Sequence, residues 1–74
     1  MTQSVNELVA DILGLDPSEV DDDYSREAAD NWDSLNHLRI ITAVERSYSV
    51  SLTMKEIEDA TSVRRLAELV SRKP

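Results

Sequence analysis

The apolar residues near the start of the chain recur at the spacing of one helix face. From Val5 they follow at i+3, i+4, i+7 and i+8, which predicts a helix over about residues 5–13. Ser4 and Glu7 stand where a capping box needs them, and Gly14 stands where a left-handed C-cap belongs. The apolar stripe consists of Val5, Leu8, Val9, Ile12 and Leu13.

A second helix is predicted to begin near Asp33 or Ser34. Its apolar residues cover a wider surface than a helix packed on one side requires, so we expect part of that surface to face a partner. The apolar positions of this helix are Leu35, Leu38, Ile40, Ile41, Val44 and Tyr48.

Two shorter patterns complete the chain. A capping box that opens at Thr53 predicts a short helix, and a last helix is expected from Thr61 or Ser62 to about Ser71. No pattern typical of a strand is present. The predicted class is therefore all-α, a small four-helix bundle of three longer helices and one short helix, with a long loop between the first and the second. The residues expected to face inward are Ile57, Ala60, Val63, Leu66, Ala67, Leu69 and Val70.

The long connection over residues 15–33 is polar and acidic. A cap followed by a proline predicts one short helical turn at Asp16–Glu19. A connection of this length inside a compact domain is often functional. The residues expected to anchor it to the core are Leu15, Val20, Tyr24, Ala28 and Trp32.

The composition narrows the possible partners. The chain has 74 residues, which we take as one domain over 1–74, and a net charge of −7. The first 38 residues hold ten acids and one base, Arg26, whereas the rest hold five acids and seven bases. This balance disfavours nucleic acid, because phosphate backbones are bound by Lys and Arg. No apolar run approaches the roughly 20 residues that cross a bilayer, and no signal-peptide pattern is visible, so we expect no membrane contact and a cytoplasmic location.

Residues Trp32, Asp33, Ser34 and Leu35 form a Trp-Asp-Ser-Leu motif at a predicted helix start. With the framing segments ILGLDPSEVDDD, AVERSYSVSL and EIEDATSVRRLAELV, nearly the whole chain resembles the acyl carrier protein family. The resemblance implies that a phosphopantetheinyl transferase attaches 4′-phosphopantetheine from coenzyme A to Ser34. The arm supplies the thiol that this cysteine-free chain lacks, and it carries an acyl or aminoacyl group as a thioester. Loading ligases, synthases or transferases would act on that cargo, and the carrier itself would catalyse nothing.

The resemblance also assigns residues to surface and core. Leu35 and Leu38 match positions that contact partners beside the arm, Ile40 and Val44 match core positions, and Ile41 is left undecided. We expect His37 to be exposed. The predicted partner-binding residues are Leu35, Asn36, His37, Leu38 and Arg39.

Two departures from the family pattern point to a specialised pathway. Trp32 stands where many fatty-acid and polyketide carriers have glycine, and residues 36–46 are near neutral or slightly basic where fatty-acid carriers are acidic. Since charge complementarity selects partners, the standard fatty-acid partners are disfavoured, and the acidic surface falls in the 16–33 loop. An aminoacyl or peptidyl carrier remains an alternative, although such carriers typically have glycine in place of Asp33.

The same residues allow other interpretations. Ser34 as a plain helix cap would make the chain a helical interaction module without a prosthetic group. A hydrolase triad of Asp33, Ser34 and His37 is rejected because all three lie within one turn and no glycine-rich oxyanion loop is present. No metal site is predicted: a calcium loop starting at Asp21 would hold arginine and tryptophan at its sixth and twelfth positions. A monomer is expected, and a solvated helix face is assigned to Arg64, Arg65, Arg72 and Lys73.

Overall fold

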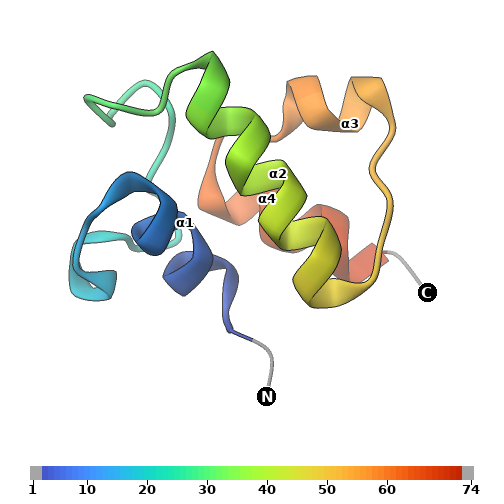
Figure 1. Ribbon diagram of the computed structural model, residues 1–74, viewed down its shortest axis with the longest axis horizontal. Helices are drawn as coiled ribbons and strands as arrows, with labels where there is room; N and C mark the ends of the chain where they lie inside the picture. The colour runs from blue at the N-terminus through green and yellow to red at the C-terminus, as the bar shows by residue number, and fades with distance from the viewer. Residues whose placement is uncertain (1–2, 73–74) are drawn as a thin grey trace.

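The computed structural model describes residues 3–72 (Figure 1). In this range the elements are α1 (Val5–Leu13), η1 (Pro17–Glu19), α2 (Ser34–Tyr48), α3 (Met54–Asp59) and α4 (Val63–Arg72). The predicted all-α class and helix order are confirmed, and α1 has the predicted bounds. Residues 3–72 contain no strand, and none of their helices is long and apolar enough to cross a membrane. Lys73 lies outside the described residues.

Local capping chemistry explains where the helices begin and end. The Ser4 hydroxyl accepts a hydrogen bond from the Glu7 amide, and the Glu7 carboxylate accepts one from the Ser4 amide. Gly14 ends α1 in the left-handed conformation, at φ 72°. Asp16 caps η1 by accepting hydrogen bonds from the backbone amide and the hydroxyl of Ser18. These hydrogen bonds lower the pKa of Asp16. Thr53 begins α3 with the predicted capping box. Short-range patterns in the sequence therefore determine these boundaries.

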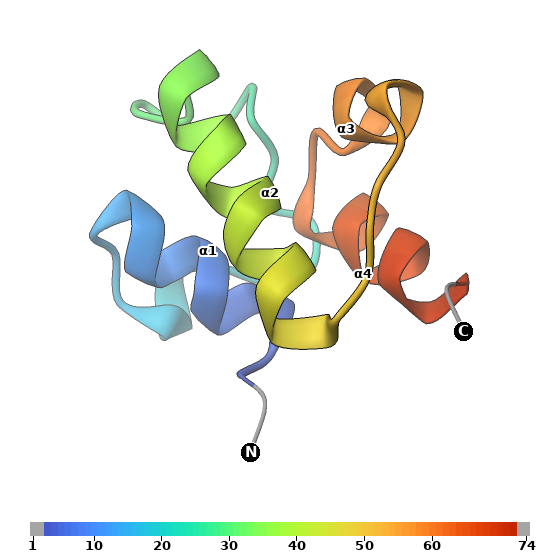
Figure 2. The same cartoon turned by 45° about the vertical axis from the view of Figure 1, so that its right-hand side comes forward.

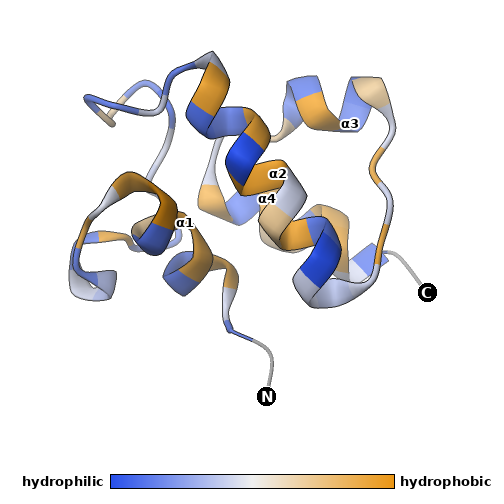
Figure 3. Ribbon diagram, in the orientation of Figure 1, coloured by the Kyte–Doolittle hydropathy of each residue, from blue (hydrophilic) through white to orange (hydrophobic). Residues whose placement is uncertain are grey.

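Helix α2 lies between α1 and α3 in both views (Figures 1 and 2), and α1 packs against α2, α4 and η1. Apolar and polar positions recur along the same helices (Figure 3). Ile40 and Val44 are fully buried as predicted, and the undecided Ile41 also belongs to the core. Two predicted core residues, Ala28 and Ala67, are instead exposed, because Ala29 packs on the core from the loop and Ala67 lies at the edge of the α4 stripe. The core consists of Val5, Leu8, Val9, Ala10, Leu13, Val20, Trp32, Ile40, Ile41, Val44, Leu52, Ala60, Val63 and Leu66.

Truncating the central residue of α2 tests this packing. Ile40→Ala is expected to lower the free energy of unfolding by about 2–5 kcal/mol, because it removes a fully buried side chain and leaves a cavity. Urea unfolding followed by circular dichroism measures the change. Thr42→Ala on the exposed side of α2 is the control and should stay within about 0.5 kcal/mol of wild type. Equal stability of both variants would contradict the assigned core.

The loop before α2 is tied to the start of α4. The amides of Val63 and Arg64 donate to the carbonyls of Tyr24 and Asp22, both at 3.0 Å, and the Arg26 amide donates to Thr61 at 2.8 Å. An isolated antiparallel bridge joins Ser25 and Ser62. The first amides of a helix lack partners within it, so loop carbonyls complete the capping of α4.

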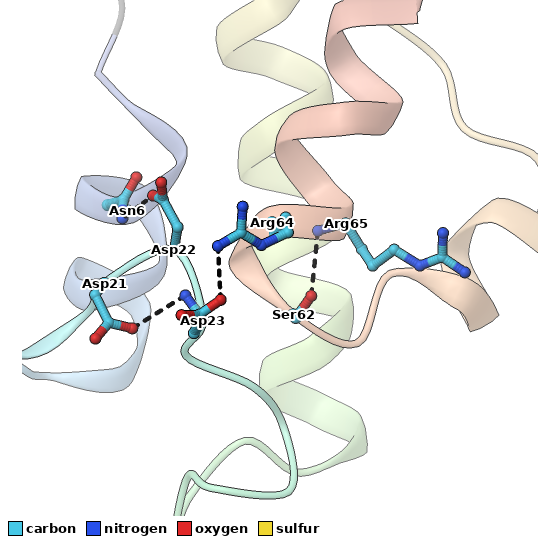
Figure 4. A network of polar contacts seen from close by, with 7 residues as sticks. All are labelled: Asn6, Asp21, Asp22, Asp23, Ser62, Arg64 and Arg65. Carbon is cyan, nitrogen blue, oxygen red and sulfur yellow. Dashed lines mark hydrogen bonds and ion pairs between the residues drawn. The ribbon is translucent and has the colours of Figure 1, made fainter.

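The acidic run in this loop has structural contacts (Figure 4). Asp22 accepts a hydrogen bond from Asn6 at 3.1 Å, and Asp21 accepts the Asp23 amide at 3.0 Å. Asp23 pairs with Arg64 at 2.6 Å, and this hydrogen bond raises the pKa of the guanidinium. Both partners are exposed, so the pair itself contributes little stability. Within residues 3–72, no group of three or more His, Cys, Asp or Glu side chains is arranged to hold a metal ion.

Candidate functional site

At the start of α2, the residue that caps the helix and the residue that exposes a hydroxyl are two different, adjacent residues. Asp33 is the N-cap, and its carboxylate accepts the Asn36 amide at 2.8 Å. Ser34 follows as the first helical residue, and it is exposed. The interpretation of Ser34 as a plain cap is therefore wrong, because Asp33 has that role. A negative group on the Ser34 oxygen would lie at the positive end of the helix, where it is stabilised by about 0.3–1 kcal/mol.

A guanidinium from the preceding loop contacts this hydroxyl. Arg26 Nη2 donates to Ser34 Oγ at 3.3 Å, and Arg26 Nε donates to the Trp32 carbonyl at 3.0 Å. Arg26 is not among the residues that the sequence pattern predicts for the site. A signal was present, since Arg26 is the only Lys or Arg among the first 38 residues.

Trp32, His37 and the Ile57 carbonyl form a buried chain of hydrogen bonds behind the site. The Trp32 side chain is 3% exposed, as expected of a loop anchor, and its Nε1 donates to His37 Nδ1 at 2.9 Å. His37 Nε2 lies 2.7 Å from the Ile57 carbonyl. An indole nitrogen only donates, so Nδ1 accepts, and Nε2 carries the proton toward Ile57.

These hydrogen bonds show that the predicted exposure of His37 is wrong. The residue is 6% exposed rather than on the surface, because α3 covers that side of α2 and supplies the Ile57 carbonyl. Its side chain is buried, so His37 is also withdrawn from the predicted partner surface. Both ring nitrogens contact groups other than Ser34, so the structure does not form the serine–histidine pair of a hydrolase.

The outer face of α2 beside Ser34 is apolar with a basic edge. Leu35 and Leu38 are 60% and 56% exposed, and Arg39 is exposed next to them. Asn36 is half-buried, and its amide nitrogen donates to the Asn31 carbonyl at 2.8 Å. A shallow groove continues from this face to α1, lined by Ile12, Leu35, Leu38, Arg39, Thr42, Ala43 and Arg46.

Residues 3–70 match the protein family described as phosphopantetheine attachment site. The chain is 38% identical to polyketide-8 synthase acyl carrier protein 2 of Streptomyces avermitilis, over 96% of this chain and 82% of that protein. It is a member of the acyl carrier protein family. It also superposes on the solution structure of a holo acyl carrier protein from Geobacter metallireducens, with a TM-score of 0.81 and 26% identity over 93% of this chain and 79% of that one.

Membership of the acyl carrier family explains the architecture of the site. The family carries 4′-phosphopantetheine covalently, and the exposed Ser34 hydroxyl at the start of α2 suits such an attachment. The arm supplies a thiol for thioester chemistry in a chain that has no cysteine. The carrier function predicted from the motif is confirmed.

Proposed function

We propose that Ser34 is the attachment residue and that this carrier delivers acyl intermediates of a polyketide-type pathway. The observation that carries the assignment is the division of roles at the start of α2, where Asp33 caps the helix and leaves the Ser34 hydroxyl exposed. The named relative that acts in polyketide synthesis supports the choice of pathway and favours acyl over aminoacyl cargo. The length of the family match supports one carrier domain over 1–74.

The attachment step requires little of the carrier. Ser34 Oγ forms a bond to the phosphorus on the pantetheine side of coenzyme A, the pyrophosphate linkage breaks, and 3′,5′-ADP leaves. The hydroxyl proton passes to a base of the phosphopantetheinyl transferase. This chain presents the oxygen at the start of a capped helix, which limits the orientations that the transferase must accommodate.

The proposed partner surface consists of Leu35, Asn36, Leu38 and Arg39 with the adjoining groove. Exposed apolar residues beside a functional site are typical of protein interfaces. The phosphopantetheinyl transferase would bind this face first. The ligase, synthase or transferase that loads the cargo would bind the same face afterwards. Between residues 36 and 46 the formal charge is +1, so the acidic residues that would steer basic partners lie in the 16–33 loop. A cytoplasmic monomer remains part of the proposal.

Mass spectrometry tests the attachment directly. The protein is incubated with coenzyme A and a phosphopantetheinyl transferase of broad specificity, and the intact mass is followed by fragmentation. We expect a gain of one phosphopantetheinyl group located on the residue 32–35 segment. No gain beside an active control carrier, or a gain elsewhere in the chain, would refute the assignment to Ser34.

A charge placed on the apolar face tests the partner surface. Leu38→Glu is expected to lower kcat/KM for a loading enzyme at least about tenfold, because the apolar contact is lost and a charge must be desolvated. Met54→Glu on α3 is the matched control, since Met54 is also apolar and is 73% exposed. Both variants should fold like wild type. Unchanged loading of Leu38→Glu would remove this face from the proposal.

A further inference from the structure

Arg26 is held in place on both its backbone and its side chain. Its amide donates to the Thr61 carbonyl at 2.8 Å, and its Nε donates to the Trp32 carbonyl at 3.0 Å. The same guanidinium reaches Ser34 Oγ through Nη2 at 3.3 Å. The Trp32 ring is in turn anchored by His37, so the carbonyl that holds Arg26 belongs to the buried part of the fold.

We propose that Arg26 binds the phosphodiester of the arm once the arm is attached. This contact would orient the end of the arm that is joined to the protein. This inference rests on the proposed attachment at Ser34. After attachment, Oγ becomes an ester oxygen and the negatively charged phosphate oxygens lie one phosphorus atom away from it. A guanidinium that already contacts Oγ is within reach of those oxygens. Guanidinium–phosphate hydrogen bonds are among the stronger polar contacts in proteins.

The distribution of charge along the chain indicates that Arg26 neutralises the charge of the phosphodiester. Attachment adds one negative charge next to Asp33, and the first 38 residues of the chain hold ten acids and a single base. That single base is the residue that contacts the attachment oxygen. Neutralisation by Arg26 therefore offsets the repulsion that loading would otherwise add around the first turn of α2.

The anchoring of Arg26 makes the contact stronger than an ordinary surface pair. Exposed ion pairs are weak partly because two flexible side chains lose freedom when they meet. Arg26 is half-buried, and its Nε is already bound to Trp32, so much of that cost is met when the domain folds.

The test compares the unfolding midpoint before and after loading. The difference between holo and apo midpoints is measured for wild type, Arg26→Gln and the control Arg65→Gln, an exposed arginine on α4. At low ionic strength, Arg26→Gln should lower this difference by about 4–8 °C relative to wild type, and Arg65→Gln should leave it unchanged. High salt should make this effect of Arg26→Gln smaller, because salt screens the charge interaction. A purely structural role for Arg26 would affect both forms equally and cancel in the difference.

The outcomes separate this inference from the proposed function. If wild type gains no arm, attachment at Ser34 fails and the role of Arg26 falls with it. If wild type is loaded but all variants show the same difference, only the role of Arg26 is overturned. Should Arg26→Gln not fold, NMR of the wild type decides: the Arg26 Nε–H signal is expected to shift on loading, and an unchanged signal would overturn the inference.

Discussion

Ser34→Ala is expected to abolish phosphopantetheine attachment while the helical fold persists. The substitution removes the oxygen that would form the phosphoester, and no other residue of the first turn of α2 carries a hydroxyl. Intact mass after incubation with coenzyme A and the transferase gives the readout. We expect a complete loss of the mass gain in the variant under conditions that convert the wild type fully.

Stability measurements separate this loss from damage to the helix. Because Asp33 caps α2 and Ser34 is exposed, Ser34→Ala should change the free energy of unfolding by no more than about 0.5 kcal/mol. Asp33→Ala should instead cost about 0.5–2 kcal/mol, because it removes the cap. Modification of Ser34→Ala at wild-type efficiency would show that the arm is attached elsewhere. A large loss of stability in Ser34→Ala would show that the Ser34 side chain contributes to the stability of this helix start.

Trp32→Ala is expected to be the most destabilising single substitution at the site. It empties a nearly fully buried aromatic position, which typically costs about 3–5 kcal/mol. A domain of 74 residues has roughly 4–11 kcal/mol in total at typical values per residue, so the variant would be marginally stable. Loading should also slow, since the segment that presents Ser34 loses the buried ring that anchors it.

Trp32→Phe separates packing from hydrogen bonding in this effect. Phenylalanine keeps much of the aromatic volume but cannot donate to His37, which leaves Nδ1 buried without its donor. The unpaired nitrogen should cost about 1–3 kcal/mol. Unfolding in urea is followed by circular dichroism, because Trp32 is the only tryptophan and both variants lose its fluorescence. Wild-type stability of Trp32→Phe would show that the Trp32–His37 bond contributes nothing.

Local chemistry made much of the fold readable from the sequence. The capping boxes at Ser4 and Thr53, the glycine at position 14 and the apolar stripe of α1 all act within a few residues, and the structure has each of them where the sequence predicted. The carrier function was also predictable, because the Trp-Asp-Ser-Leu motif occurs at a helix start in a chain of the right length and pattern.

The environment of Ser34 depended on tertiary structure. His37 was expected on the surface from its place in α2, but the position of α3, which supplies the Ile57 carbonyl, buries its ring. Likewise, Ala28 and Ala29 are equivalent in the sequence, and only the path of the loop decides which of them packs on the core.

The sequence by itself therefore determined the helices, their caps and the candidate attachment serine, since these follow from side chains that are close along the chain. Only the tertiary structure brought Arg26 to Ser34 and joined the loop carbonyls of Asp22 and Tyr24 to the start of α4. The α4 contacts join residues about forty positions apart, and the Arg26 contact depends on the path of an irregular loop. Such contacts have no periodic signature, because they form only after the helices have packed and set the course of the chain between them.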